Sequence, residues 1–371
     1  MRKIDLLDIA YDSKKKKTRK EIFLEKMEAI IPFELCLELI RPYYYLNGNG
    51  RQPIPLETMF RMYLVSNWYN TSDEATEDLV IENHAVRRFV GLNIMSDSVP
   101  DETTLWNFRS LLEYHKLTEK IFEAINFRLE QSGILCKQGS IVDATLIAAP
   151  SSTRNKDKSR DPEMSSTKKN NNYVHGMKSG IGVDDQSGLV HTVVTKTAKV
   201  HDIEMAAELL HGEETRIGGD AGFIGLEKRE DIIKKFGAEP VESLPAKPKK
   251  RGRQPKPKAV LSLKVQMAIN RKRMKIAAMP DGEEKELLQA EEKAKSQIRA
   301  KVEYPFRYLK CVFGFRKTRV RGLERNHAKL VMMYALTNLY LLTSMGVILK
   351  QQQFLQDKSA LLQKNGAENT K

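Results

Sequence analysis

The sequence predicts an α/β protein in which a mixed β-sheet flanked by helices follows an all-helical N-terminal region. Three observations support this fold class. Residues 1 to about 135 show helical periodicity and helix-start signals but no strand pattern. From Gly139 on, short runs rich in β-branched residues alternate with helical segments. The 371 residues, 41% of them hydrophobic, are enough for about two to three domains with buried cores.

In the N-terminal region, polar turns mark the helix starts. Pro55 precedes the run LETMFRMYLVSNWY, Ser72 is placed to cap EATEDLVIENHAVRRFVG, and Asp101 precedes ETTLWNFRSLLEYH. A further helix is expected to end near Gln131. Short helices with tight turns are typical of a helical bundle, and helix-turn-helix DNA readers are one kind. We expect this bundle either to read a DNA end or to serve as a scaffold or dimerisation unit, with Trp68 and Trp106 in its core.

In the second region, the first expected strand is 140–149, SIVDATLIAA, which a polar loop follows. A turn containing Gly188 joins the next two strands, GIGV and LVHTVVTKT. DIEMAAELLHG and LEKREDIIKKFG are predicted helices on either side of the strand TRIGGD, and 240–244 is a further strand. Three antiparallel strands followed by crossover-linked parallel strands form a mixed sheet. This element order is that of the ribonuclease-H-like fold.

Most of the excess positive charge lies in one segment. The net charge is +14, and 247–275 alone holds 12 Lys or Arg and no acidic residue. Its Pro- and Gly-rich first part is expected to be an extended loop, and 261–279 a helix with a basic face. Such a density of cations predicts an arm that contacts DNA phosphates, and the alternative is a solvated insertion. Basic residues also gather in 14–20 and 154–178. The expected phosphate contacts in the arm are Lys249, Lys250, Arg251 and Arg253.

Cellular location follows from the cysteines and from hydropathy. Cys36, Cys136 and Cys311 suit neither a disulfide framework nor a zinc cluster. The first residues lack the apolar core of a signal peptide, so a cytoplasmic, nucleoid-associated protein is expected. The uncharged stretch 330–349 is long enough to span a bilayer, but polar residues interrupt it. A buried core helix is therefore predicted there, and no membrane contact is expected.

Two aspartates are expected where ligands bind in open sheets of this kind. Asp143 lies within an apolar strand, where an isolated carboxylate is costly to bury unless it is paired or holds a cation. Asp220 follows a strand and precedes glycines that allow close approach to a ligand. Hard oxygen ligands favour Mg²⁺ or Mn²⁺, and two such ions perform phosphodiester chemistry. The alternative is that neither aspartate binds a metal ion, and that Asp143 is a polar residue within the strand and Asp220 a turn residue.

A third acidic ligand is expected downstream, and Glu303 and Glu324 are the candidates. On one continuous helix, Arg299 and Lys310 would share a face with Glu303. Pro305 instead favours a helix that starts near this position, so that Arg299 arrives from the preceding segment. Glu303 is preferred on this basis, and Glu324 stays the alternative.

Four segments resemble, in order, the motifs of bacterial insertion-sequence DDE transposases, and among these the insertion-sequence-five family. They are IVDATLIAAPSSTRN, HGMKSGIGVDDQSGLVHTVVTKTAKVHD, GGDAGFIGLEKRE and RAKVEYPFRYLKCVFGFRKTRVRGLERNHAKL. The resemblance runs from Gln52 to about Leu342 and includes a helical N-terminal domain. It implies that Asp143, Asp220 and Glu303 form the acidic triad, and it places no catalytic acid at Glu324.

The third motif of related families is Tyr, two residues, Arg, three residues, Glu, six residues, Lys. Arg299 and Lys310 fit it, whereas Ser296 stands where those families have Tyr. The resemblance implies that both cations grip phosphates of a bound DNA end. His175 and His201 lie in matching motifs near the expected site, where they would touch a phosphate or orient a ligand or, alternatively, have structural roles. Lys178, in the basic region 154–178, is a further expected DNA contact.

The function that the resemblance implies is transposition. The protein would bind the inverted ends of its element, hydrolyse phosphodiester bonds with two Mg²⁺ ions (or Mn²⁺) held by the triad, and join the 3′ ends to target DNA. A homodimer or larger assembly on double-stranded DNA is expected. The alternatives are a metal-dependent nuclease without strand transfer and a non-catalytic DNA-binding derivative.

The predicted domains follow from these assignments. They are a helical DNA-binding or dimerisation domain at 1–135, a catalytic domain at 136–350 with a basic insertion at 245–295, and a polar tail at 351–371.

Overall fold

The computed structural model describes residues 11, 13–44, 53–93, 95–156, 158–169, 171–241 and 260–344. These residues form two compact units. Unit 1 contains those up to Ser132 and from Arg307 on, and unit 2 contains those from Gly133 to Phe306. The predicted phosphate contacts Lys249, Lys250, Arg251 and Arg253, like the tail 351–371, lie outside the described residues.

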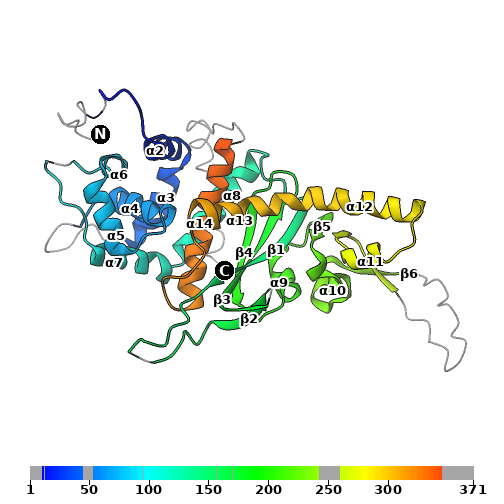
Figure 1. Cartoon of the computed structure of the whole chain (residues 1–371). Coiled ribbons are helices and arrows are strands. Elements are labelled where there is room, and N and C mark those ends of the chain that lie inside the picture. Colours follow the sequence, from blue (N-terminus) through cyan, green and yellow to red (C-terminus); the bar gives the residue numbers. More distant parts are fainter. Residues whose placement is uncertain are drawn as a thin grey trace, which may run out of the picture. The chain divides into compact units, whose positions relative to one another are not determined.

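Unit 1 is helical, as predicted. Ser72 accepts a hydrogen bond from the Ala75 N–H and caps its helix, and Asp101 caps another through the Thr104 N–H. Asn83 divides the segment 73–90 into two helices, because its extended backbone ends the first and its side chain caps the second. The helices drawn in blue and cyan in Figure 1 are α2 (Arg19–Ile30), α3 (Phe33–Ile40), α4 (Leu56–Trp68), α5 (Asp73–Glu82), α6 (His84–Val90), α7 (Glu102–Tyr114) and α8 (Leu117–Gln131), with the short turn η1 (Arg41–Tyr43) after α3.

The long helix α14 (Leu323–Ser344) also belongs to unit 1. It packs against α8, and the Asn338 side chain donates to Asn126 Oδ1 at 3.0 Å within that buried contact. The predicted core helix is confirmed over its described part, and no described helix is long and apolar enough to cross a membrane. The predicted catalytic domain at 136–350 included this helix, whereas in the structure the helix packs with the N-terminal helices.

The two tryptophans of unit 1 have different environments. Trp68 is buried, as predicted, and contacts the ring of Phe23 edge-on. Trp106 on α7 is 46% exposed, so the prediction that it belongs to the core is wrong. The helical periodicity of α7 puts Leu105, Phe108 and Leu112 on the buried side, and Trp106 falls outside that stripe.

Unit 2 is built on a six-stranded mixed sheet in the order β2-β3-β1-β5-β8, with β4 paired to β3. The strands β2, β1 and β4 pair antiparallel with β3, whereas β5 is parallel to β1 and β8 is parallel to β5. This is the mixed sheet of the ribonuclease-H-like fold that the sequence predicted. Its strands are β1 (Gly139–Ala148), β2 (Ser165–Lys169), β3 (Asn172–Asp184), β4 (Val190–Thr197), β5 (Arg216–Gly219) and β8 (Gln266–Ile269).

Two segments of unit 2 differ from the prediction. The expected loop after Ala149 contains β2 and the first half of β3. The expected helix at 261–279 instead contains most of β7 (Val260–Leu263), all of β8, and only a short helix, α11 (Arg273–Ala277). The apolar residues at 263, 265, 267 and 269 alternate with polar or small ones and pack against the core, which is the period of a strand. The strand β6 (Ala238–Val241) pairs with β7 in a separate small sheet.

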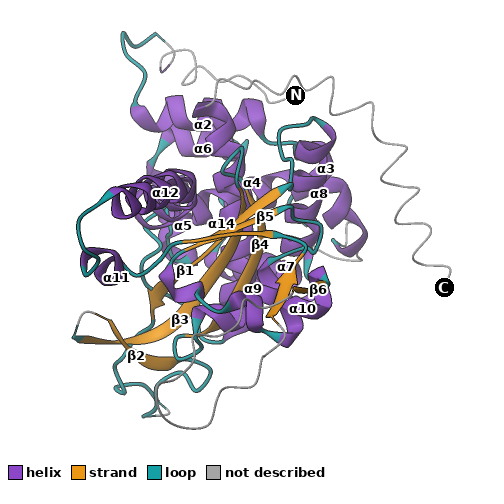
Figure 2. Ribbon diagram, turned by 90° about the vertical axis from the view of Figure 1, so that its right-hand side faces the viewer, coloured by secondary structure: helices purple, strands orange, loops and turns teal. Residues whose placement is uncertain are grey.

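The helix α9 (Asp202–Leu209) covers one face of the sheet (Figure 2), where Met205 and Leu209 pack in one cluster with Val142. Close approach requires glycine on β3, since a Cβ at Gly182 would stand 2.5 Å from the Leu209 carbonyl oxygen. The helix α10 (Glu230–Phe236) ends at Gly237, which adopts a φ of +71°. The chain then reaches α12 (Glu283–Arg299), the turn η4 (Ala300–Val302), α13 (Glu303–Arg307) and, in unit 1, the π-helical turn η5 (Tyr308–Val312).

Candidate active site

The sheet brings Asp143 and Asp220 together. The last paired residues of the parallel strands β1 and β5 are Val142 and Gly219, so the two aspartates occupy the next positions on neighbouring strands. Such strands lie about 4.8 Å apart. Asp220 leaves the sheet in a tight turn, and its Oδ1 accepts the Gly222 N–H at 2.8 Å. The predicted convergence of these two carboxylates is thus a consequence of strand register.

Burial and a like charge both act on Asp143. Its side chain is 19% exposed, and its Oδ1 accepts the N–H of Ala144 at 2.7 Å. Burial raises the pKa of Asp143 to about 6, and the negative charge of Asp220 adds to the rise, whereas the Ala144 hydrogen bond and Arg299 oppose it. The ionised form of this carboxylate is therefore short of positive charge, and a bound cation would stabilise it.

Arg299 connects Asp143 to Glu303. Its Nη1 lies 3.6 Å from Asp143 Oδ2, and its Nη2 lies 3.7 Å from Glu303 Oε1. The helix α12 ends at Arg299, but the backbone stays right-handed helical through η4, so residues four apart still share a face. Pro305 falls in the first turn of α13, where proline is tolerated. The guanidinium thus stands between two of the three predicted acids, and Glu303 itself is largely exposed to solvent.

Asp220 and Arg299 both line a hollow of about 410 Å³. We call it the Asp220–Arg299 hollow. Arg299 is therefore close to all three predicted acids. It contacts Asp143 and Glu303, and it lines the hollow together with Asp220. Cations outnumber carboxylates in the lining, which suits a phosphate-bearing ligand. The cations are Arg271, Lys272, Arg273, Lys293 and Arg299, and the carboxylates are Asp220 and Glu292.

Asn270 is a residue of this site that sequence reasoning missed. Gly219 of β5 pairs with Ile269 of β8, so Asn270 stands beside Asp220 at the strand ends. Its Nδ2 donates to Glu292 Oε2 at 3.0 Å and to Ser296 Oγ at 3.2 Å, whereas its buried Oδ1 has no hydrogen-bond partner among the described residues. The apolar alternation up to Ile269 would have predicted a strand ending here, and hence a polar side chain beside Asp220.

Lys178 and His175 lie on opposite faces of the strand β3. Ile181 on β3 pairs with Asp143, and Lys178 is three residues from it, so its side chain is on the opposite face. There, Lys178 Nζ contacts Asp202 Oδ1 at 2.9 Å and donates to the Val200 carbonyl at 2.6 Å. His175 is on the face of Asp143 but six residues along the strand, roughly 20 Å. The DNA contact of both residues stays a prediction.

The remaining predicted residues are His201, Lys310 and Glu324, and each lies on or beside a different helical element. His201 is exposed and immediately precedes α9. Lys310 lies in η5, and Glu324, the alternative acid, lies at the start of α14. Both belong to unit 1, whereas Asp143, Asp220 and Glu303 belong to unit 2.

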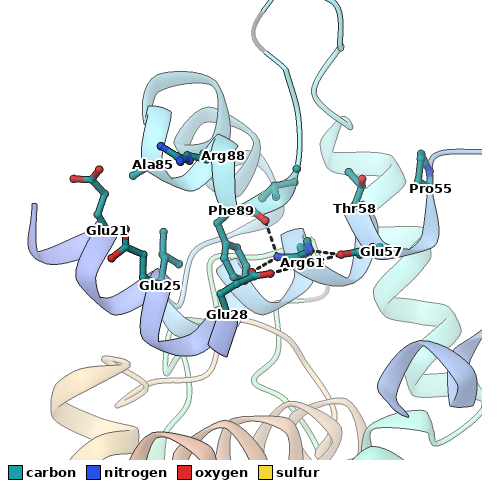
Figure 3. A pocket seen from close by; sticks show the side chains of 13 residues that line it. Glu21, Glu25, Glu28, Pro55, Glu57, Thr58, Arg61, Ala85, Arg88 and Phe89 are labelled. Atoms are coloured by element: carbon teal, nitrogen blue, oxygen red, sulfur yellow. Dashed lines mark hydrogen bonds and ion pairs between the residues drawn. The ribbon is translucent and has the colours of Figure 1, made fainter. Parts of the chain in front are cut away.

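A second hollow, of about 800 Å³, lies in unit 1 and is lined by α2, α4 and α6. Figure 3 shows Arg61 at its centre, in ion pairs with Glu28 and with Glu57. The guanidinium also lies 4.0 Å from the centre of the Phe33 ring. Glu21 and Glu25 on the same lining pair with lysines of the basic segment 14–20. Because these carboxylates are already paired and their charge repels phosphate, we interpret this hollow as structural.

Two family matches cover most of the chain. Residues 134–339 match the family described as "Transposase DDE domain", and residues 11–111 match the one described as "Transposase domain (DUF772)". No solved structure matches the chain at a significant level. The first match includes more than half of the residues, and Asp143, Asp220, Arg299 and Glu303 all fall within it.

Proposed function

This chain belongs to the DDE transposase family, and from that premise we propose that it binds the inverted ends of an insertion sequence, hydrolyses phosphodiester bonds there and joins the freed 3′ ends to target DNA. One observation carries the proposal: Arg299 contacts Asp143 and Glu303 and lines one hollow with Asp220. Bringing two ends together requires two protein sites, so a dimer or larger assembly forms on the DNA.

Asp143, Asp220 and Glu303 are the residues that would hold divalent ions, Mg²⁺ or Mn²⁺. Their hard oxygen donors fit such ions, and so does the mutual repulsion of the two aspartates. When bound, the ions activate the attacking oxygen and stabilise the leaving oxygen of an in-line displacement. Among the described side chains as they stand, no three carboxylate, imidazole or thiol groups could hold one ion. Arg299 supplies the positive charge between Asp143 and Glu303.

The Asp220–Arg299 hollow is the proposed path of the DNA backbone. Arg271, Lys272 and Arg273 line it and belong to the basic segment for which phosphate contacts were predicted. Lys293 on α12 adds a further cation. Contacts of this kind position the duplex without selecting its sequence. Arg299 therefore has two roles in the proposal, since it balances the carboxylates and grips a phosphate beside them.

The substitution Asp220→Asn tests the proposal. It removes one negative charge at nearly constant shape, so Mg²⁺-dependent nicking of end DNA should be lost while DNA binding is kept. Asp231→Asn is the matched control, because Asp231 lies on α10 and pairs with Arg229 at 2.8 Å. Nicking that survives Asp220→Asn would remove this residue from the mechanism.

A second assay separates the proposed transposase from its alternatives. Labelled 3′-hydroxyl ends are supplied together with a target plasmid, and joined products are measured. A transposase joins the ends to the plasmid, whereas a nuclease nicks DNA without joining it. A non-catalytic derivative binds DNA without metal and cleaves nothing.

A further inference from the structure

A pocket of about 230 Å³ within unit 1 gathers four cations around two carboxylates. It is lined by α4, by the turn before α5, by α7 and by the start of α14, and we call it the Lys329 pocket. Positive charge is therefore in excess at a site that contains none of the catalytic acids. The cations are Arg109, Arg319, Arg325 and Lys329, and the carboxylates are Asp73 and Glu113.

The two carboxylates are already engaged. Arg109 Nη1 contacts Asp73 Oδ1 at 2.5 Å, and its Nε lies 3.6 Å from Glu113 Oε1. Arg325 Nε lies 3.8 Å from the other oxygen of Glu113. Within the part of the chain that the structure describes, neither Lys329 nor Arg319 has a carboxylate at ion-pair distance. Among the described residues, these two cations of the pocket thus have no ion-pair partner, and the four cations exceed the two carboxylates.

Lys329 is held in place by uncharged partners. Its Nζ donates to Asn70 Oδ1 at 3.2 Å and lies 5.3 Å from the centre of the Phe315 ring. Asn70 adopts a left-handed φ of +46°, and its Nδ2 donates to the Gly314 carbonyl at 3.2 Å. Burial lowers the pKa of Lys329 to about 8, and the positive charges of Arg109 and Arg319 lower it further, whereas the negative charges of Asp73 and Glu113 oppose the fall. An anion in the pocket would stabilise the charged form of Lys329 and raise its pKa.

We propose that the Lys329 pocket binds one phosphate group of a DNA backbone, with Lys329 and Arg319 as its ligands. A volume of about 230 Å³ is below the roughly 300–1,000 Å³ of sites for larger organic ligands, so a single phosphate fits better than a nucleotide. Ser72 and Asp73 at the N-terminus of α5 add the positive end of a helix dipole to the lining. The assignment of this phosphate to DNA rests on the proposed function. The preference of the pocket for a phosphate group rests only on the residues that line it.

Binding of a duplex of arbitrary sequence tests this pocket, since phosphate contacts do not depend on sequence. Affinity is measured by fluorescence anisotropy over a series of salt concentrations. Lys329→Met and Arg319→Gln should each weaken binding about tenfold and lower the salt slope by about one. Lys26→Gln removes an exposed charge elsewhere in unit 1 and should change neither quantity. Arg319 is exposed, so its substitution tests the pocket even if Lys329→Met fails to fold.

Inorganic phosphate at constant ionic strength distinguishes the source of the ligand. It should raise the melting temperature of the wild type more than that of Arg319→Gln. If both pocket variants bind DNA like Lys26→Gln, the DNA assignment is overturned, and phosphate-dependent stabilisation would then indicate a pocket for free phosphate. If the wild type does not nick end DNA but Lys329→Met and Arg319→Gln still weaken DNA binding, the proposed chemistry is contradicted and the phosphate site is supported.

Discussion

At neutral pH the ionised carboxylate of Asp143 opposes folding, and removing its charge should stabilise the metal-free protein. Burial and Asp220 raise the pKa of this group from 3.8 to about 6. Each pKa unit corresponds to about 1.36 kcal/mol, so Asp143→Asn should gain at most roughly 3 kcal/mol at pH 8. For a unit of this size that is a rise of roughly 6–12 °C in melting temperature. The same variant should have lost Mg²⁺-dependent nicking.

The sign of the pH dependence follows from the direction of the shift. Because the folded pKa is above the unfolded one, the penalty is absent at pH values below about 4 and complete above about 6. The gain from Asp143→Asn in chelator-treated protein should therefore be largest at pH 8 and shrink toward pH 4. Asp231→Asn should show no gain, because its hydrogen bond with Arg229 lowers the pKa of that carboxyl. Equal melting temperatures for wild type and Asp143→Asn at pH 8 would refute this reasoning.

Three further changes have defined outcomes. Arg299→Gln should lower the melting temperature of the metal-free protein at pH 8, because Asp143 loses its cation, and should reduce the salt slope of DNA binding by about one. Asn270→Ala should slow Mg²⁺-dependent nicking by about tenfold in a gel assay with unchanged DNA affinity, because Glu292 and Ser296 lose their anchor beside Asp220. Gly182→Ala should cost about 1–3 kcal/mol in urea unfolding, since the new Cβ would meet Leu209 and His191 at 2.5 Å.

Local signals made much of the fold predictable. The caps at Ser72 and Asp101 and the turn at Gly188 depend on residues close in sequence, and the structure has all three. The segment 261–279 was misassigned because its basic composition resembled a helical face. Its apolar alternation, which ends at Ile269, is the signal that identifies β8.

Long-range packing and strand register were harder to predict from the sequence. The Asn338–Asn126 contact groups α14 with the N-terminal helices, and no local pattern indicates such a partner. At the candidate site, strand ends predicted that Asp143 and Asp220 meet, and helical spacing predicted Arg299 beside Glu303. The face on which Lys178 lies depends on the register between β1 and β3, which the sequence alone does not fix.

Binding of Mn²⁺ reports whether Asp143, Asp220 and Glu303 form one metal site. Water-proton relaxation during a Mn²⁺ titration of the full chain measures this binding without requiring DNA cleavage. We expect the wild type to bind and each of Asp143→Asn, Asp220→Asn and Glu303→Gln to bind more weakly, because each removes a ligand charge. Wild-type affinity in Glu303→Gln, with loss in the two aspartate variants, would contradict a site made of all three.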